Sequence, residues 1–185
     1  MNCTVKNNKI FLSESNSFSI TPLFKPIEIA GLTVEDFLRT AKEAITGEKQ
    51  YFMQFHNDLV EKMEKLHINP EYADRHLNVG FSGGEKKKNE ILQMAVLEPK
   101  LAILDETDSG LDRDATKVVF EGVQKLKTKD NAMLIITHYD KVLDYLEPDF
   151  VHVLMDGRIV KTGGKEIVEM IEKFGYGKIR QDLGL

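Results

Sequence analysis

The chain has little cysteine, and this scarcity limits the chemistry open to it. Among its 185 residues only Cys3 carries a thiol. An internal disulfide is therefore impossible, and an iron–sulfur cluster or a thiolate zinc site would have too few ligands. This cysteine usage fits a reducing compartment such as the cytosol.

Long apolar runs and an excess of basic charge are missing as well. No stretch approaches the ~18 consecutive apolar residues of a membrane-spanning helix, and segment 1–20 lacks the apolar centre of a signal peptide. The net charge of −5 at pH 7 argues against a broad nucleic-acid surface. Hydrophobic residues make up 42% and charged residues 30%, as in ordinary globular proteins. We expect a cytoplasmic protein that neither binds nucleic acid nor inserts directly into a membrane.

The pattern of the chain divides it into three predicted parts. Segment 1–30 is atypical, and its apolar run 10–13 is compatible with a strand. Segment 31–97 is predicted to be a helical subdomain. Thr33 begins one helix that ends at Gly47, a second helix covers 50–66, and a third begins near Glu85.

Segment 98–185 has the rhythm of an α/β protein. LAILD (101–105) and AMLIITH (132–138) are apolar runs of strand length on either side of an amphipathic helix. This order predicts parallel pairing through a crossover helix. FVHVL and RIVKTG flank an Asp-Gly turn and predict a hairpin, and a last helix is expected over 165–174.

Two acids end the first apolar run of this α/β segment. Asp105 and Glu106 follow LAIL, and the carboxyl ends of strands in such sheets open onto the ligand crevice. Asp105 could hold Mg²⁺ through water, and Glu106 could orient or deprotonate an attacking water. A strand that ends at an acidic turn explains the pair equally well.

The segment FSGGE (81–85) places Ser82, Gly83 and Gly84 just before a helix. Glycine lets the backbone approach a phosphate, and the N–H groups of a first helical turn point at it. A glycine loop with Ser82 as helix cap is the alternative. The lysines at 86–88 are most often a solvated face, or one of them pairs with an acid after LAILD and tunes Glu106.

Two further residues follow in the order of the chain. Asp112 ends the SGLD turn, where capping the next helix is a sufficient role. His138 follows the second apolar run, at the sheet edge of Asp105 and Glu106, as a phosphate ligand or a structural donor. Each signal is weak alone, but the order of SGG-E, apolar-DE, SGLD and apolar-TH is improbable by chance.

That order resembles the nucleotide-binding domain of ABC ATPases, with a signature motif, a Walker B strand, a D-loop and a switch histidine. The longer stretches NVGFSGGEKKKNEILQMAVLEP, LDETDSGLD, PDFVHVLMDGRIVKTG and GYG are similar to the SufC family, the ATPases of Suf iron–sulfur cluster assembly. The resemblance covers about residues 26–180. It implies the α/β fold of an ABC-type P-loop NTPase with a helical subdomain, in which 98–185 is the α/β core.

The resemblance also implies ligands, residue roles and partners. ATP and Mg²⁺ would be the cofactors, and the SufB–SufD scaffold and a second copy, paired head-to-tail on ATP, would be the partners. The lobe between Thr33 and Leu97 would face the scaffold. The resemblance implies that Ser82, Gly83 and Gly84 contact the γ-phosphate held by the opposite subunit. It gives Asp105 the role of magnesium ligand and Glu106 that of catalytic base. Asp112 would be the D-loop aspartate, and His138 would contact the γ-phosphate.

Two family elements are missing from the sequence. The P-loop G-x-x-x-x-G-K-[ST] has no match, since Gly-Gly-Lys at 163–165 is followed by Glu166 and is expected to be a turn. No glutamine precedes Gln50, so the Q-loop glutamine is absent too. The P-loop provides most of the hold on the β- and γ-phosphates. We therefore expect weak ATP binding by the isolated chain, and an exposed edge beside LAILD.

Three interpretations stay open on the sequence alone. The chain is an ABC-type ATPase subunit that couples ATP binding and hydrolysis to the SufB–SufD scaffold. Alternatively it is a non-catalytic truncated module that binds the scaffold or a full-length copy. The third is an ABC transporter ATPase subunit, which the Suf-like wording disfavours.

Overall fold

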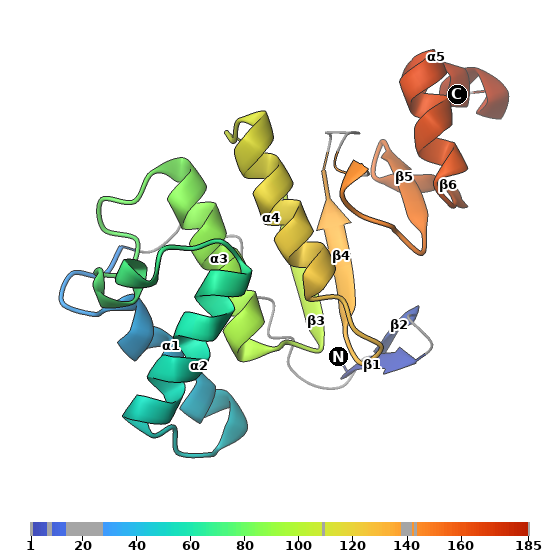
Figure 1. Ribbon diagram of the computed structural model, residues 1–185. Helices are drawn as coiled ribbons and strands as arrows, with labels where there is room; N and C mark the ends of the chain where they lie inside the picture. The colour runs from blue at the N-terminus through green and yellow to red at the C-terminus, as the bar shows by residue number, and fades with distance from the viewer. Residues whose placement is uncertain are drawn as a thin grey trace. The chain divides into compact units, whose positions relative to one another are not determined.

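The computed structural model describes residues 2–6, 9–13, 28–108, 110–137, 142 and 144–184, the first two ranges as backbone. The chain forms two compact units, Met1–Thr137 and His138–Leu185 (Figure 1). Within the first unit, strand β1 (Asn2–Lys6) pairs antiparallel with β2 (Lys9–Ser13). The second of these strands contains the predicted run 10–13.

Helices make up the middle of the first unit. They are α1 (Val34–Thr46), α2 (Phe52–Lys65), the short 3₁₀ helix η1 (Pro70–Asp74) and α3 (Gly83–Leu97). The predicted limits of α1 are confirmed, because the Thr33 side chain accepts a hydrogen bond from the Asp36 amide and Gly47 ends the helix with φ 72°. None of the described helices is long and apolar enough to cross a membrane.

The core of these helices lies where α3 packs against α1, α2 and α4 (Figure 1). Its fully buried apolar side chains come from all four helices: Val34, Leu38, Leu59, Met63, Leu92, Val119, Phe120 and Val123. Their burial removes apolar surface from water, which is the main driving force for folding.

Two lysines bind the end of α3 to the preceding helices. Lys42 of α1 donates to the Val96 carbonyl at 2.7 Å, and Lys62 of α2 donates to the Ala95 carbonyl at 2.9 Å. Both ammonium groups also pair with Glu98, the C-cap residue, at 3.3 and 2.9 Å. Cations here satisfy carbonyls that lack partners within the helix and offset the negative end of its dipole.

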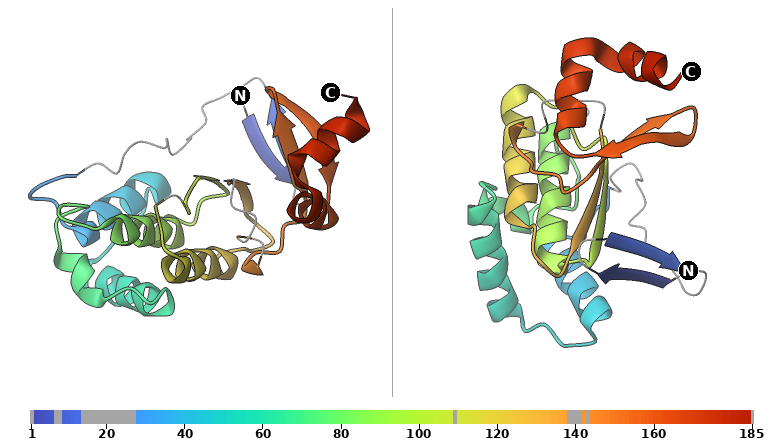
Figure 2. Two further views of the ribbon diagram at one scale, coloured as in Figure 1. Left: turned by 90° about the horizontal axis from the view of Figure 1, so that it is seen from above. Right: turned by 90° about the vertical axis from the view of Figure 1, so that its right-hand side faces the viewer.

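The predicted parallel pair is confirmed. Strand β3 (Leu101–Asp105) pairs in parallel with β4 (Ala132–Ile136), and α4 (Arg113–Lys125) is the crossover between them. Asp105 pairs in register with Ile136, so the residues that follow both strands meet at one edge of the sheet. Figure 2 shows α3 and α4 on the same side of this sheet.

The other face of the β3–β4 sheet is exposed among the described residues. Side chains alternate along a strand, and this face carries Ile103 and Leu134, which are register partners, together with Ile136. Leu134 is 41% exposed and Ile136 is 47% exposed. In the described chain the sheet contains only these two strands, which agrees with the edge expected beside LAILD.

The second unit is a hairpin with one helix. Strands β5 (Val151–Met155) and β6 (Arg158–Gly163) pair antiparallel as predicted, around a turn at Asp156 and Gly157 whose φ angles of 49° and 76° are both positive. Gly163 ends β6, and Gly164 and Lys165 form the turn into helix α5 (Glu166–Leu183), which confirms the turn expected before the last helix.

The expected end of the last helix near Phe174 matches a break in α5, because the backbone of Gly175 is non-helical (φ 69°, ψ 176°). A second helical segment, which the sequence analysis did not predict, follows this break and runs to Leu183. Ile179, beyond this break, is buried with Val153, Met155 and Ile167. The apolar contact made by Ile179 accounts for the added helical turns.

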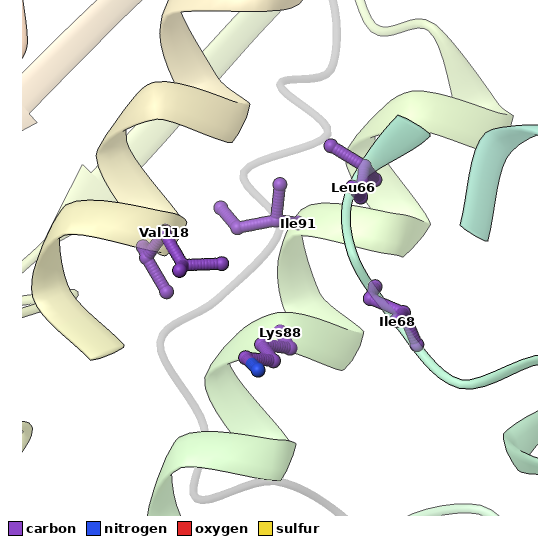
Figure 3. Close-up of a pocket in the computed structure, with 6 residues that line it drawn as sticks. Leu66, Ile68, Lys88, Ile91 and Val118 are labelled. Carbon is purple, nitrogen blue, oxygen red and sulfur yellow. The ribbon is translucent and has the colours of Figure 1, made fainter. Parts of the chain in front are cut away.

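A small hollow lies between α3, α4 and the chain that follows α2 (Figure 3). Its lining is apolar apart from Lys88 and includes Leu66, Ile68 and Ile91. A volume of about 10 Å³ leaves room for about one water molecule, whereas small-molecule sites occupy hundreds of Å³. The hollow is therefore a packing defect and no ligand site.

Candidate functional site

The start of α3 is capped by its own side chains and exposes its first residues. Ser82 is the N-cap, and its hydroxyl accepts from the Glu85 amide at 3.2 Å. The Glu85 carboxylate accepts in turn from the Ser82 amide at 2.6 Å, which completes a capping box. Ser82 and Gly83 are exposed. A first helical turn has N–H groups without partners in the helix and the positive end of its dipole, so it favours an anion.

Helix α3 begins at Gly83, whereas the expected start was near Glu85. The predicted glycine loop is therefore part of the first turn, and the alternative role of Ser82 as a cap is confirmed. Gly84 adjoins the turn after β3, because a Cβ on Gly84 would lie 3.8 Å from Leu111 Cδ2. The structure thus brings the signature segment next to the SGLD segment.

Glu85 is held by a tyrosine and an arginine that lie before α3. Its Oε1 accepts from the Tyr72 hydroxyl and, at 3.0 Å, from Arg75 Nη1. The Arg75 guanidinium lies 4.6 Å from the ring centre of Tyr72 and 4.1 Å from that of Phe81. Hydrogen bonds from Tyr72, the Ser82 amide and Arg75 lower the pKa of Glu85 to about 2. The carboxylate is therefore ionised at any physiological pH.

A second group of candidate residues lies at the carboxyl edge of β3 and β4. Asp105 ends β3, and Glu106 follows it in the left-handed backbone region with φ 46°. The Glu106 amide donates to the Ile136 carbonyl at 2.8 Å, and its side chain is exposed. A non-glycine residue in this backbone region is uncommon and costs energy, and such positions cluster at functional sites.

The sequence did not reveal a second link across this edge. The Thr137 hydroxyl donates to both carboxylate oxygens of Asp108, at 3.1 and 3.2 Å, and Asp108 is buried. The bond joins the turn after β3 to the end of β4. His138 and Ser109 lie outside the described residues.

Asp112 caps α4, as the sequence predicts. Its side chain accepts from the Ala115 amide at 2.8 Å. The idea that a lysine of 86–88 pairs with an acid after β3 is not supported for two of the three. Lys86 pairs with Glu28 at 2.6 Å and Lys87 with Glu90 at 3.2 Å. Neither partner is an acid that follows β3.

The residues at the sheet edge fit magnesium in part. No group of three or more His, Cys, Asp or Glu side chains gathers as a metal site in the described chain. Mg²⁺ commonly uses one or two carboxylates, with water and substrate phosphates as its remaining ligands. Asp105 and Glu106 supply such carboxylates, so a magnesium ion there would depend on a bound phosphate. A P-loop cradle is absent from the sequence.

Two sets of contacts at the start of α3 were missed in the sequence. The capping box of Ser82 and Glu85 could have been found, because these residues stand at the S-x-x-E spacing. Tyr72 and Arg75 stand in an irregular connector, where no spacing rule predicts that they reach Glu85.

In sequence and fold the chain is similar to ATP-binding cassettes. No family model matches the chain. The chain is 52% identical over 162 residues to Vegetative protein 296 of Bacillus subtilis, an alignment that covers 86% of this chain and 62% of that protein. It is equally similar, over 162 residues, to a probable ABC transporter ATP-binding protein of Streptococcus pyogenes (86% of this chain, 63% of that protein). A probable ATP-dependent transporter of Synechocystis is 52% identical over 155 residues (82% and 60%).

Solved structures confirm the fold class. An ATP-binding cassette of an ABC transporter in its ADP conformation superposes with TM-score 0.61 and 26% identity, over 80% of this chain and 62% of that chain. A dimeric cassette in a post-hydrolysis state with ADP and phosphate superposes with TM-score 0.64 at 16% identity, over 77% and 61%. The fold is that of part of an ABC ATP-binding cassette, and the chain spans about 62% of the length of such relatives.

Proposed function

We propose that this chain is a SufC-like ABC ATPase subunit of iron–sulfur cluster assembly, and that it lends its signature motif to ATP held by a complete copy. The observation that carries the proposal is the start of α3, where Ser82 and Gly83 are exposed and the capping box holds the first turn in place. This end of the helix attracts an anion, while the sequence offers no P-loop to hold ATP within the chain.

The residues have distinct roles in this proposal. The Ser82 hydroxyl accepts from the Glu85 amide and still has its own proton to donate to a phosphate oxygen. The amides of Gly83 and Gly84 point in the same direction as first-turn donors. Asp112 orders the neighbouring D-loop segment through its cap on α4. Together they would bind the γ-phosphate of ATP on the partner copy.

Asp105 and Glu106, at the carboxyl end of β3, would act on a nucleotide bound to this chain. Asp105 would hold Mg²⁺, which when bound neutralises phosphate charge. Glu106 is exposed at the strand end and would accept a proton from the attacking water, and His138 would bind the γ-phosphate. These roles require phosphates that the chain itself has no loop to hold.

An exposed apolar group supports a scaffold partner. Where α1 ends and α2 begins, large hydrophobic side chains between 56% and 67% exposed stand close in the sequence: Ile45, Tyr51, Phe52 and Met53. Such groups are typical of protein interaction sites. We propose that a SufB–SufD-like scaffold contacts this group.

An ABC transporter subunit is the second candidate function. It is favoured by the names of the Streptococcus pyogenes relatives, which are probable ABC transporter ATP-binding proteins. A non-catalytic module that only occupies the scaffold would bind it without a nucleotide response. Affinity capture with SufB–SufD against membrane permeases, with and without ATP, separates these candidates.

The proposed function is tested by pairing. The chain is mixed with a complete SufC-type protein whose own signature serine is replaced by arginine, so that this protein cannot complete a site with itself. We expect ATP-dependent association in analytical ultracentrifugation, which Ser82→Arg abolishes and Ala44→Arg, at an exposed position of α1, does not. Equal association of the Ser82→Arg chain would contradict the proposal, as would ATP turnover by the pure chain that Glu106→Gln abolishes.

A further inference from the structure

Arg75 is the residue that connects the irregular chain before α3 to the signature helix. Its guanidinium lies over both the Tyr72 ring and the Phe81 ring, whose centres are 5.4 Å apart. Nη1 donates to Glu85 at 3.0 Å, and Nη2 donates to the Gly80 carbonyl at 3.4 Å. Cation–π contacts and a charged hydrogen bond thus fix one side chain from several directions.

The negative charge of Glu85 would repel a phosphate at the first turn of α3. Its carboxylate bonds the Ser82 amide, so a negative charge lies at the turn that the proposed function assigns to phosphate. Two like charges a few ångströms apart repel each other strongly in a partly desolvated site. Glu85 cannot escape by taking up a proton, because the hydrogen bond from Tyr72 and those from Ser82 and Arg75 hold its pKa at about 2.

The Arg75 charge is placed to cancel this repulsion. Arg75 forms an ion pair with Glu85 in which the arginine side chain is 33% exposed and the glutamate side chain is 26% exposed. Solvent therefore screens the pair only in part. The neutralised pair leaves the helix dipole and the Ser82 and Gly83 donors as the local attraction for an anion.

We propose that Arg75 is the positioning and charge-balancing residue of the signature helix: it orients Glu85 as the cap of α3 and offsets its charge, so that the turn at Ser82–Gly84 can accept a terminal phosphate. This inference rests on the proposed function, since the phosphate belongs to ATP on the partner copy. Arg75 acts through Glu85 and not by contact with the nucleotide.

A charge-rescue series tests the role of Arg75. Arg75→Gln leaves the Glu85 charge uncompensated and should weaken ATP-dependent pairing by roughly tenfold or more. Glu85→Gln keeps a residue that can complete the capping box. The double variant Arg75→Gln with Glu85→Gln removes both charges, and pairing should return to within about threefold of the wild-type chain.

The same series separates charge balance from mere structural support. If Arg75 only supports the fold, the double variant loses still more contacts and should pair less well than either single variant. Thermal unfolding by circular dichroism measures stability in parallel, so a variant that has unfolded is recognised. Recovery of pairing without recovery of stability is the expected result, and a double variant as weak as Arg75→Gln overturns the inference.

A second measurement keeps this test separate from the proposed function. In the isolated chain, inorganic phosphate is titrated while the amide resonances of Gly83 and Gly84 are followed by NMR. Their shifts should need at least about tenfold more phosphate to saturate in Arg75→Gln, and the double variant should restore the wild-type response. Absent pairing of the wild-type chain refutes the proposed function alone. Equal phosphate responses of the wild-type chain and Arg75→Gln refute the role of Arg75.

Discussion

Lys62→Met is expected to destabilise the helical part of the first unit. The methionine keeps the apolar stem but removes the ammonium group that donates to the Ala95 carbonyl and to Glu98, both at 2.9 Å. The carbonyl is a terminal acceptor of α3, and the lysine side chain is 31% exposed. A charged hydrogen bond to such a carbonyl, together with its interaction with the helix dipole, contributes about 1–2 kcal/mol.

Lys65, the last residue of α2, provides a matched control on the same helix. Its ammonium group pairs with Glu61 at 2.5 Å, but both side chains are more than 60% exposed, and water screens the pair. Urea unfolding followed by circular dichroism at 222 nm should show a loss for Lys62→Met and no measurable loss for Lys65→Met. Equal losses would show that the Ala95 carbonyl does not depend on Lys62.

The pH dependence of this contact adds a second check. The hydrogen bond from Lys62, followed by the charges of Lys62 and Lys42, lowers the pKa of Glu98. A depressed folded pKa means that the contribution is present above the unfolded pKa and is lost as the pH falls through the folded pKa. The cost of Lys62→Met should therefore shrink in acid. A cost that grows on acidification would refute this account.

Further predictions concern the core, a histidine and the exposed sheet face. Phe120→Ala, at a fully buried position, should lower the free energy of unfolding by about 3–5 kcal/mol, measured by urea titration. The hydrogen bond of His56 with Glu35 raises the pKa of the imidazole. Its stabilising contribution is thus full below the unfolded pKa and is lost as the pH rises through the folded pKa, and unfolding curves of His56→Gln should lack this pH dependence. Leu134→Lys, on the exposed face of β4, should change stability by less than about 0.5 kcal/mol while it reduces self-association in light scattering.

Elements with local signals were predictable from the sequence. Thr33 and Gly47 give the limits of α1 because a cap and a left-handed glycine act within a few residues. The pairing of β3 with β4 was predictable since two apolar runs around an amphipathic helix have one favoured handedness and topology. The Asp-Gly turn of the β5–β6 hairpin belongs to the same class of short-range signals.

Elements whose limits depend on distant contacts were not predictable. Glycine has low helix propensity, so Gly83 and Gly84 resembled a loop, whereas the capping box and Arg75 hold them in the first turn of α3. The link from Thr137 to Asp108 joins residues far apart in the chain and left no local pattern. The order of the motifs indicated the acids at the end of β3, but the contact of Arg75 with Glu85 emerged only from the structure.

The break at Gly175 changes how the last helical residues should be regarded. Ile179 lies beyond the break and is 1% exposed, so the segment after Gly175 contributes to the hydrophobic core of the second unit. Deleting them would uncover Val153 and Met155 to solvent. Affinity tags and fluorescent fusions are therefore best attached beyond the end of α5 at Leu183, and a shortened version that stops at Gly175 should be prone to proteolysis.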